Sequence, residues 1–155
     1  MPPSDVVAVT SMRDYFRDAV DAALAHQALD PNAATSAYLV ELLCEYAREQ
    51  RDLFARPLTW VFARAESAAP GESFQQLKEV GDHSLYVAGY FNDSLPHLEL
   101  DLDYFVKLGS TAYRKLSRLL QLPRGRTRFV VVFSELGQEF TRFVQVLNDV
   151  RRLAD

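Results

Sequence analysis

The chain has 155 residues, 48% of them hydrophobic, with one cysteine and a formal net charge of −4. A chain of this size fits one domain that buries about 70% of its unfolded surface, so its fold needs no disulfide or metal. The single cysteine excludes an intrachain disulfide, and no segment approaches the ~18 continuous apolar residues of a membrane span. The composition predicts a soluble cytoplasmic protein, with residues 1–10 as a flexible tail and 11–155 as a single domain.

Three helical patterns occupy the first half of the domain. Thr10 or Ser11 can cap the first, whose apolar side continues to about residue 28. Asp30 followed by Pro31 is the second start signal, an N-cap with proline at the first helical position, and the apolar row after it reaches residue 46. Pro57 should end or bend any continuation of this helix. A short third helix then covers residues 58–65.

Three longer helical patterns follow, at 73–91, 105–120 and 129–147. Gly81, Gly89 and Gly109 interrupt the first two of them. Because glycine costs a helix about 1 kcal/mol relative to alanine, these glycines predict close backbone approach to a neighbour or a ligand. Residues 97–103 alternate polar and apolar, so they are either a short extended segment or a cap for the next helix. Residues 129–133 also suit a strand, although the row continuing to 147 favours helix. The sequence predicts an all-α single-domain bundle of about six helices, with 74–91 at its centre.

A polar and aromatic stripe runs along the predicted central helix. Glu79, His83, Tyr86 and Tyr90 are spaced at i, i+4, i+7 and i+11, which places them on one side, opposite the main apolar row. Tyrosine is enriched where a surface meets another protein or lines a pocket. Two interpretations stay open: the tyrosines contact a partner or ligand, or neighbouring helices cover them and they belong to the core. Tyr104 is a further candidate for a shared pocket.

Charge is distributed unevenly along the chain. Residues 1–110 hold 8 basic and 17 acidic residues, whereas residues 111–155 hold 9 basic and 4 acidic ones. Six cations form a basic segment near the junction of the last two predicted helices: Arg114, Lys115, Arg118, Arg124, Arg126 and Arg128. This segment is either a solvated face that pairs with the chain's own acidic helices or a contact surface for an acidic partner, nucleic acid or phosphate. The pI of about 5.4 and the lack of a binding motif argue against nucleic acid.

Signatures of catalysis are missing from the sequence. His26, His83 and His97 are not at a two-histidine ligand spacing, and the pair Glu79 and His83 lacks the second Glu-x-x-His of a di-iron bundle. Cys44 is predicted on the polar side of its helix with a partly exposed thiol, but no histidine pattern accompanies it. The sequence therefore predicts no catalytic residue, no metal site and no cofactor.

Two segments in the middle third, VGDHSLYVAGYF (80–91) and DLDYFVKLGSTAY (101–113), resemble small uncharacterised bacterial proteins known only as hypothetical. The resemblance implies a bacterial cytosolic protein and carries no functional residue. The two candidate surfaces lead to the prediction of a non-enzymatic interaction or regulatory module that binds a protein partner, with a homodimer as one form of that pairing. The alternative is a small-molecule binding protein or enzyme, with an interhelical pocket lined by His83, Tyr86, Tyr90 and Tyr104.

Overall fold

The computed structural model describes residues 4–49, 57–121 and 128–154, and every regular element within these ranges is helical. The protein is an all-α single-domain bundle, as the hydrophobic periodicity predicts. Its elements in chain order are α1 (Ser4–His26), α2 (Ala33–Arg48), α3 (Leu58–Ser67), α4 (Pro70–Tyr90), the 3₁₀ turns η1 (Asn92–Ser94) and η2 (Pro96–Leu98), α5 (Leu102–Gln121), α6 (Arg128–Gln138) and α7 (Phe140–Ala154). In the described residues α1 begins at Ser4, earlier than the caps expected at Thr10 or Ser11.

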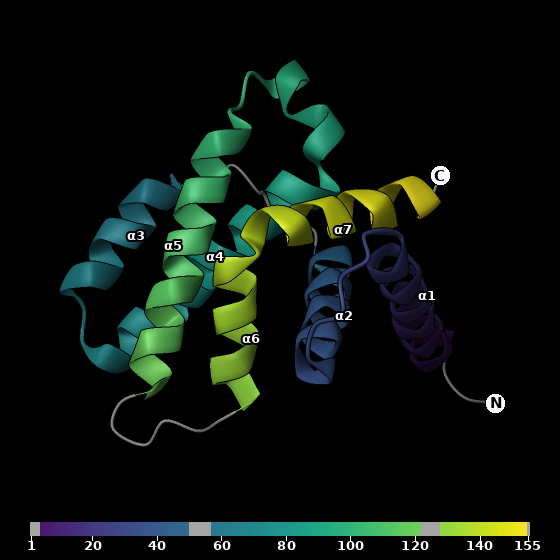
Figure 1. Ribbon diagram of the computed structural model, residues 1–155, viewed down its shortest axis with the longest axis horizontal. Helices are drawn as coiled ribbons and strands as arrows, with labels where there is room; N and C mark the ends of the chain where they lie inside the picture. The colour runs from purple at the N-terminus through teal and green to yellow at the C-terminus, as the bar shows by residue number, and fades with distance from the viewer. Residues whose placement is uncertain (1–3, 50–56, 122–127, 155) are drawn as a thin grey trace.

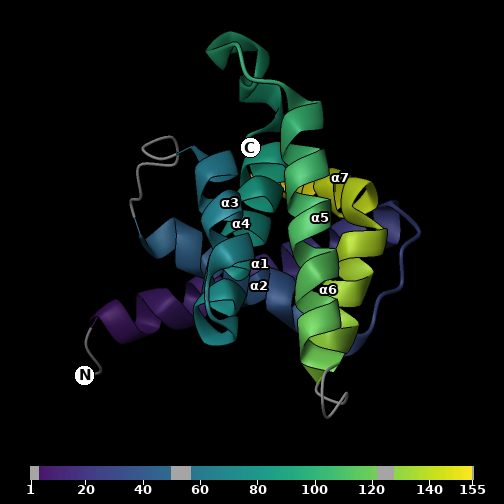
Figure 2. The ribbon, with the colours of Figure 1, turned by 90° about the vertical axis from the view of Figure 1, so that its left-hand side faces the viewer.

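Helix α4 is the centre of the bundle, as its sequence predicts. Residues 80–89 are all buried except His83, so this part of the helix is covered on nearly every side. It packs against α3, α5 and α7, while α5 also packs against α6, and α1 lies against α2 and α7. Figure 1 shows α7 crossing over α1 and α2, and Figure 2, from the side, shows α3 in front of α4 with α5 beside them. The core consequently surrounds the C-terminal half of α4 rather than meeting it along one stripe.

The glycines mark close helix crossings, which confirms the expectation from the sequence. A Cβ atom added to Gly81 would lie 2.6 Å from Cε1 of the Tyr113 ring on α5. One added to Gly89 would lie 2.6 Å from Cβ of Leu147 on α7, and one added to Gly109 would collide with the Phe140 ring. Real Cβ atoms do not approach other heavy atoms so closely, because interiors are already packed to crystal-like density. The glycines therefore let α5 and α7 come close to α4.

The start of α2 differs from its prediction, whereas the start of α5 agrees with one of its two alternatives. The N-cap of α2 is Asn32, whose Oδ1 accepts a hydrogen bond of 2.9 Å from the Ala34 amide, so the prediction of Asp30 with Pro31 at the first helical position is wrong. Residues 97–103 are not extended: η2 is followed by Glu99 in the left-handed region, with φ of 56°. Asp101 then accepts a hydrogen bond of 3.0 Å from the Asp103 amide at the start of α5, so this segment caps the helix, which was the other expectation from the sequence.

The predicted sixth helix is in fact two. Residues 129–133 are helical, as favoured, but α6 ends at Gln138 and α7 begins at Phe140 in a different direction (Figure 1). Near the bend, a Cβ atom on Gly137 would lie 2.8 Å from Arg114 Cγ, so this glycine allows α6 to approach α5. The change of direction lets α6 follow α5 while α7 crosses α4 and α1, which one straight helix could not do.

Candidate functional site

Tyr86, the middle of the predicted tyrosine stripe, lies in the core. Its side chain is 7% exposed, and its ring stacks on Tyr46 at 4.5 Å and on Tyr90 at 5.2 Å between centroids. Burial raises the pKa of Tyr86 to about 12; the nearby Tyr90 adds to this and Arg151 opposes it. Since neighbouring rings stack on it, Tyr86 has the surroundings of a packing residue.

The other members of the stripe lie at the edge of the core. Glu79, His83 and Tyr90 are half-buried, and the His83 ring is 6.4 Å from that of Tyr46. The guanidinium of Arg151 on α7 lies 5.2 Å from the centre of the Tyr90 ring, within the range of a cation–π contact. The structure thus brings His83 and Tyr90 into one aromatic cluster with Tyr46 and Tyr86, and Arg151 of α7 lies against its edge.

Tyr104 belongs to a different part of the molecule. It is 36% exposed near the start of α5, and its hydroxyl accepts a hydrogen bond of 3.3 Å from the amide of Thr59, in the first turn of α3. The structure therefore places this residue against α3. It does not give Tyr104 the stacked surroundings that Tyr86 and Tyr90 share.

A buried carboxylate at the centre of the bundle was not anticipated from the sequence. Asp82 on α4 is 5% exposed, and its Oδ1 accepts hydrogen bonds from the hydroxyls of Tyr38 (2.6 Å) and Tyr113 (2.7 Å). Its Oδ2 accepts one of 2.8 Å from Lys78 Nζ, one turn earlier on α4. Burial raises the pKa of Tyr38 and Tyr113, and the adjacent Asp82 carboxylate raises both further. The pair Lys78 and Asp82 at i, i+4 was visible in the sequence, but the tyrosines lie on two other helices.

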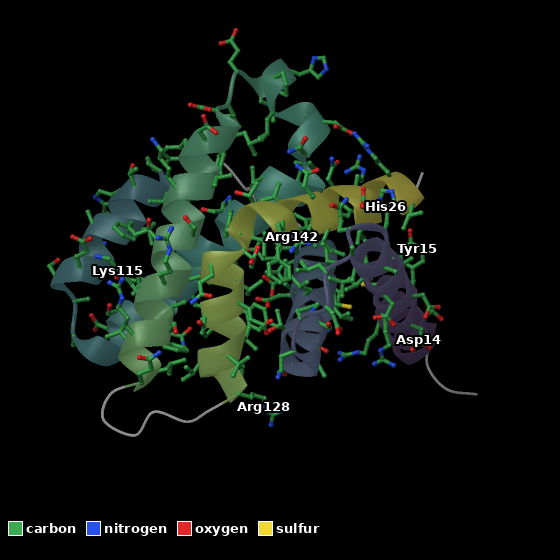
Figure 3. All side chains as sticks on the ribbon, in the orientation of Figure 1. Asp14, Tyr15, His26, Lys115, Arg128 and Arg142 are labelled. Carbon is green, nitrogen blue, oxygen red and sulfur yellow. The ribbon has the colours of Figure 1, made fainter. Side chains whose placement is uncertain are left out.

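The residues of the basic segment lie in different surroundings. Lys115 Nζ forms an ion pair of 2.7 Å with Glu66 on α3 and lies 5.1 Å from the centre of the Phe62 ring. Arg114 turns back on its own helix, where Nη2 donates to Ser110 Oγ at 3.1 Å. Figure 3 shows Lys115 on the side of α5 that faces α3 and Arg128 at the far end of α6. Arg124 and Arg126 lie outside the described residues.

An open groove of about 550 Å³ runs between the C-terminal ends of α3 and α5, over the start of α4. We call it the α3/α5 groove. Its described lining consists of Ala65, Glu66, Ala68, Ser73, Leu77, Lys115, Arg118 and Leu119. Ala65 and Leu77 are buried and form an apolar floor, whereas Leu119 is 37% exposed at the edge beside Lys115 and Arg118. Two members of the basic segment thus line a surface with exposed apolar area.

Two further grooves, of about 510 and 410 Å³, lie along α1 and α2. Their charged lining residues include Asp21, Asp30, Arg17 and Glu41, so acids predominate over cations there. They are opposite in charge to the α3/α5 groove.

Cys44 is not on a polar face. The prediction of a partly exposed thiol is wrong, because the residue is 3% exposed on the inner side of α2. Burial raises its pKa, an effect that the charges of Arg13 and Arg48 oppose. A buried thiol with a raised pKa is a packing residue rather than a nucleophile. In the described ranges no three of the residues His, Cys, Asp and Glu form a group that could hold a metal ion.

Comparison with known proteins finds no match among family models, curated proteins or solved structures. The described helices also include none that is long and apolar enough to cross a membrane. Any functional conclusion therefore depends on the surfaces of the chain itself.

Proposed function

We propose that the chain is a non-enzymatic interaction module of the bacterial cytoplasm, and that it binds a protein partner through the α3/α5 groove. The observation that carries the proposal is the combination, in one groove, of a buried apolar floor, an exposed leucine and two cations. Partner surfaces characteristically have an apolar centre with a polar rim. The resemblance of the middle third to bacterial hypothetical proteins supports the compartment.

Arg118 strengthens this interpretation. It is exposed, and it forms no ion pair with any residue in the described ranges. Leu119, its neighbour on α5, exposes apolar area at the same edge. A single exposed leucine is ordinary on a protein surface. Leu119, however, lies beside Arg118, a cation with no such ion pair, and next to the apolar floor of the groove, and this combination is typical of a contact surface.

The aromatic cluster supports the alternative function less well. Tyr46 and Tyr90 both stack on the Tyr86 ring, and Tyr104 instead contacts α3. A pocket shared by His83, Tyr86, Tyr90 and Tyr104 would need Tyr104 to leave α3 and the stacked rings of Tyr86 and Tyr90 to separate. The geometry consequently favours the groove as the contact surface.

The test uses a matched pair of surface leucines. Leu119→Asn removes apolar area from the groove edge, whereas Leu153→Asn makes the same change at a residue on α7 that is 58% exposed and lies outside the groove lining. Affinity capture from native lysate with wild type and both variants, followed by mass spectrometry, should recover a protein that Leu119→Asn loses and Leu153→Asn retains. Light scattering of the same variants shows whether that protein is a second copy of the chain. Equal recovery by all three proteins would contradict the proposal.

A further inference from the structure

We infer that the α3/α5 groove binds an acidic amphipathic helix, whose carboxylates displace Glu66 from Lys115. This inference rests on the proposed function and names the chemistry of the partner. It follows from the charge of the groove, from the shape of its floor, and from an ion pair that crosses it.

The described lining of the groove carries a net positive charge. Its described lining holds two cations, Lys115 and Arg118, and one acid, Glu66. Glu66 is already engaged with Lys115 at 2.7 Å, which leaves Arg118 as the uncompensated charge of this lining. Complementary charge steers association and suppresses wrong partners, so an occupant with carboxylates beside its apolar side chains fits this surface.

The shape of the floor favours a helix. Ala65 lies in α3 and Ala68 is the C-cap of the same helix, three positions later, so both side chains lie on one side of it. Such small side chains let the axis of a neighbouring helix come close. Among the recurring modes of peptide recognition, strand addition needs a sheet edge, and the described ranges contain no strand. Proline-rich segments need an aromatic-lined groove, and none of the described lining residues is aromatic. The helix-in-groove mode, with apolar anchors on one face, matches what is present.

Glu66 occupies the position that a carboxylate of the partner would take. The side chains of Lys115 and Glu66 are 38% and 51% exposed, so their ion pair is weak and can exchange. Glu66 therefore competes with an acidic partner for Lys115. This arrangement predicts effects of opposite sign: removing the charge of Glu66 should strengthen binding, and removing that of Lys115 should weaken it.

The experiment uses two synthetic helical peptides of about 18 residues, or five turns, each with leucines at i, i+3, i+4 and i+7. One carries glutamate beside the leucines and the other glutamine at the same positions. Binding is followed by ¹⁵N chemical shifts and by fluorescence anisotropy, with wild type, Glu66→Gln, Lys115→Gln and Arg118→Gln. Arg152→Gln is the matched control, since Arg152 is 64% exposed on α7 and lies outside the groove lining. A single-stranded oligonucleotide is titrated in parallel.

We expect the acidic peptide to shift the resonances of Ala65, Ala68 and Leu119 and to bind more tightly than the glutamine peptide. Glu66→Gln should bind it about two- to five-fold more tightly, and Lys115→Gln and Arg118→Gln should each weaken binding by a similar factor. Arg152→Gln should leave it unchanged. Raising the salt from about 50 to about 300 mM should weaken binding, because it shortens the screening length.

The inference fails if the two peptides bind equally or not at all, if Glu66→Gln weakens binding, if the shifts lie outside the groove, or if the oligonucleotide binds there instead. The proposed function has a separate test in the Leu119→Asn capture. A partner that is lost with Leu119→Asn but bound equally by wild type and the Glu66, Lys115 and Arg118 variants would refute the acidic helix and leave the interaction module standing.

Discussion

Tyr38 and Tyr113 donate hydrogen bonds to the same oxygen atom, Oδ1 of Asp82, from α2 and α5 respectively. Nζ of Lys78 donates a hydrogen bond to the other carboxylate oxygen, Oδ2. Because a buried carboxylate is tolerated only when its partners are in place, this arrangement fixes three helices relative to one another. The carboxylate is therefore a structural tie at the centre of the bundle.

The first prediction concerns this tie. Asp82→Ala should lower the free energy of unfolding by about 3–5 kcal/mol, because it leaves two buried hydroxyls and a lysine without their common acceptor. Asp82→Asn keeps an oxygen for the tyrosines but turns an amide toward Lys78, so it should cost less, about 1–3 kcal/mol. Urea unfolding followed by circular dichroism measures both values. Midpoints equal to that of wild type would show that the carboxylate contributes nothing.

The second prediction is a pH dependence that the same residues produce. The pKa of Tyr38 and Tyr113 is raised in the folded state, above the ordinary value near 10. Above that value an unfolded chain releases tyrosine protons that the folded chain retains, so stability should fall as the pH rises. Absorbance near 295 nm at about pH 11 should report fewer tyrosinates than the seven tyrosines of the chain, with the remainder appearing only on unfolding. Full ionisation of all seven while the helical signal persists would refute this.

The helices could be predicted from the sequence because their signal is local. Apolar residues that recur at i, i+3 and i+4 lie on one face of a helix, and this periodicity can be recognised within a single segment. The predicted close approach at Gly81 is also local, since a glycine within the apolar row of a helix lowers helix propensity and usually has a packing reason. The bend between α6 and α7 was not predicted, because it depends on what each helix packs against rather than on a break in the apolar row.

The proposed contact surface could be predicted only in part. Lys115 and Arg118 stood out as members of a charge cluster, but the floor of the groove comes from α3 and α4, and no pattern within α5 indicates it. The same limit applies to Tyr86. The spacing of the stripe placed it on one face of α4, but whether that face is buried depends on Tyr46 of α2, which stacks on its ring. The Asp82 tie needed partners 44 and 31 positions away in sequence, beyond the reach of any periodicity argument.

The third prediction tests the close crossing of α4 and α5. Gly81→Ala places its Cβ against the Tyr113 ring, which is fully buried and hydrogen-bonded and so cannot move aside. It should destabilise the fold, and Gly81→Leu more so, by about 1–3 kcal/mol. Gly71 on the same helix is the matched control, because an added Cβ meets nothing within 4 Å. Gly71→Ala should therefore be neutral or gain up to about 1 kcal/mol in helix propensity. Equal denaturant midpoints for both alanine variants would contradict the crossing.

The fourth prediction concerns the end of α1. Ala28 has a φ of 52°, in the left-handed region, and the Leu29 amide donates to the Leu24 carbonyl at 3.0 Å, as in a Schellman cap. Alanine is strained in this conformation by about 1–2 kcal/mol, whereas glycine is not. Ala28→Gly should thus raise the melting temperature, although Ala25→Gly, one turn earlier and inside the helix, should lower it. A decrease of similar size in both variants would show that Ala28 is not held in this cap.

The last prediction concerns the polar contacts that join α1 to α7. Asp149 Oδ2 lies 2.7 Å from His26 Nδ1 and accepts a hydrogen bond of 2.6 Å from Gln27 Nε2, and Figure 3 shows His26 at the end of α1 beneath α7. Burial works to raise the pKa of Asp149, but the hydrogen bonds from Gln27 and His26, helped by nearby positive charge, lower it overall.

A carboxyl group whose folded pKa is lowered contributes stability above its unfolded pKa, and that contribution disappears as the pH falls through the folded value. Asp149→Asn should therefore be less stable than wild type at pH 7, by less than about 1 kcal/mol because His26 is largely exposed to solvent. As the pH is lowered toward about 2, the carboxylate is progressively protonated in both states, so the difference in urea midpoint between the two proteins should shrink. Asp18→Asn, an exposed residue on α1, serves as the control and should show no such convergence. A difference between wild type and Asp149→Asn that persists unchanged at low pH would mean that the carboxylate charge does not hold α1 against α7.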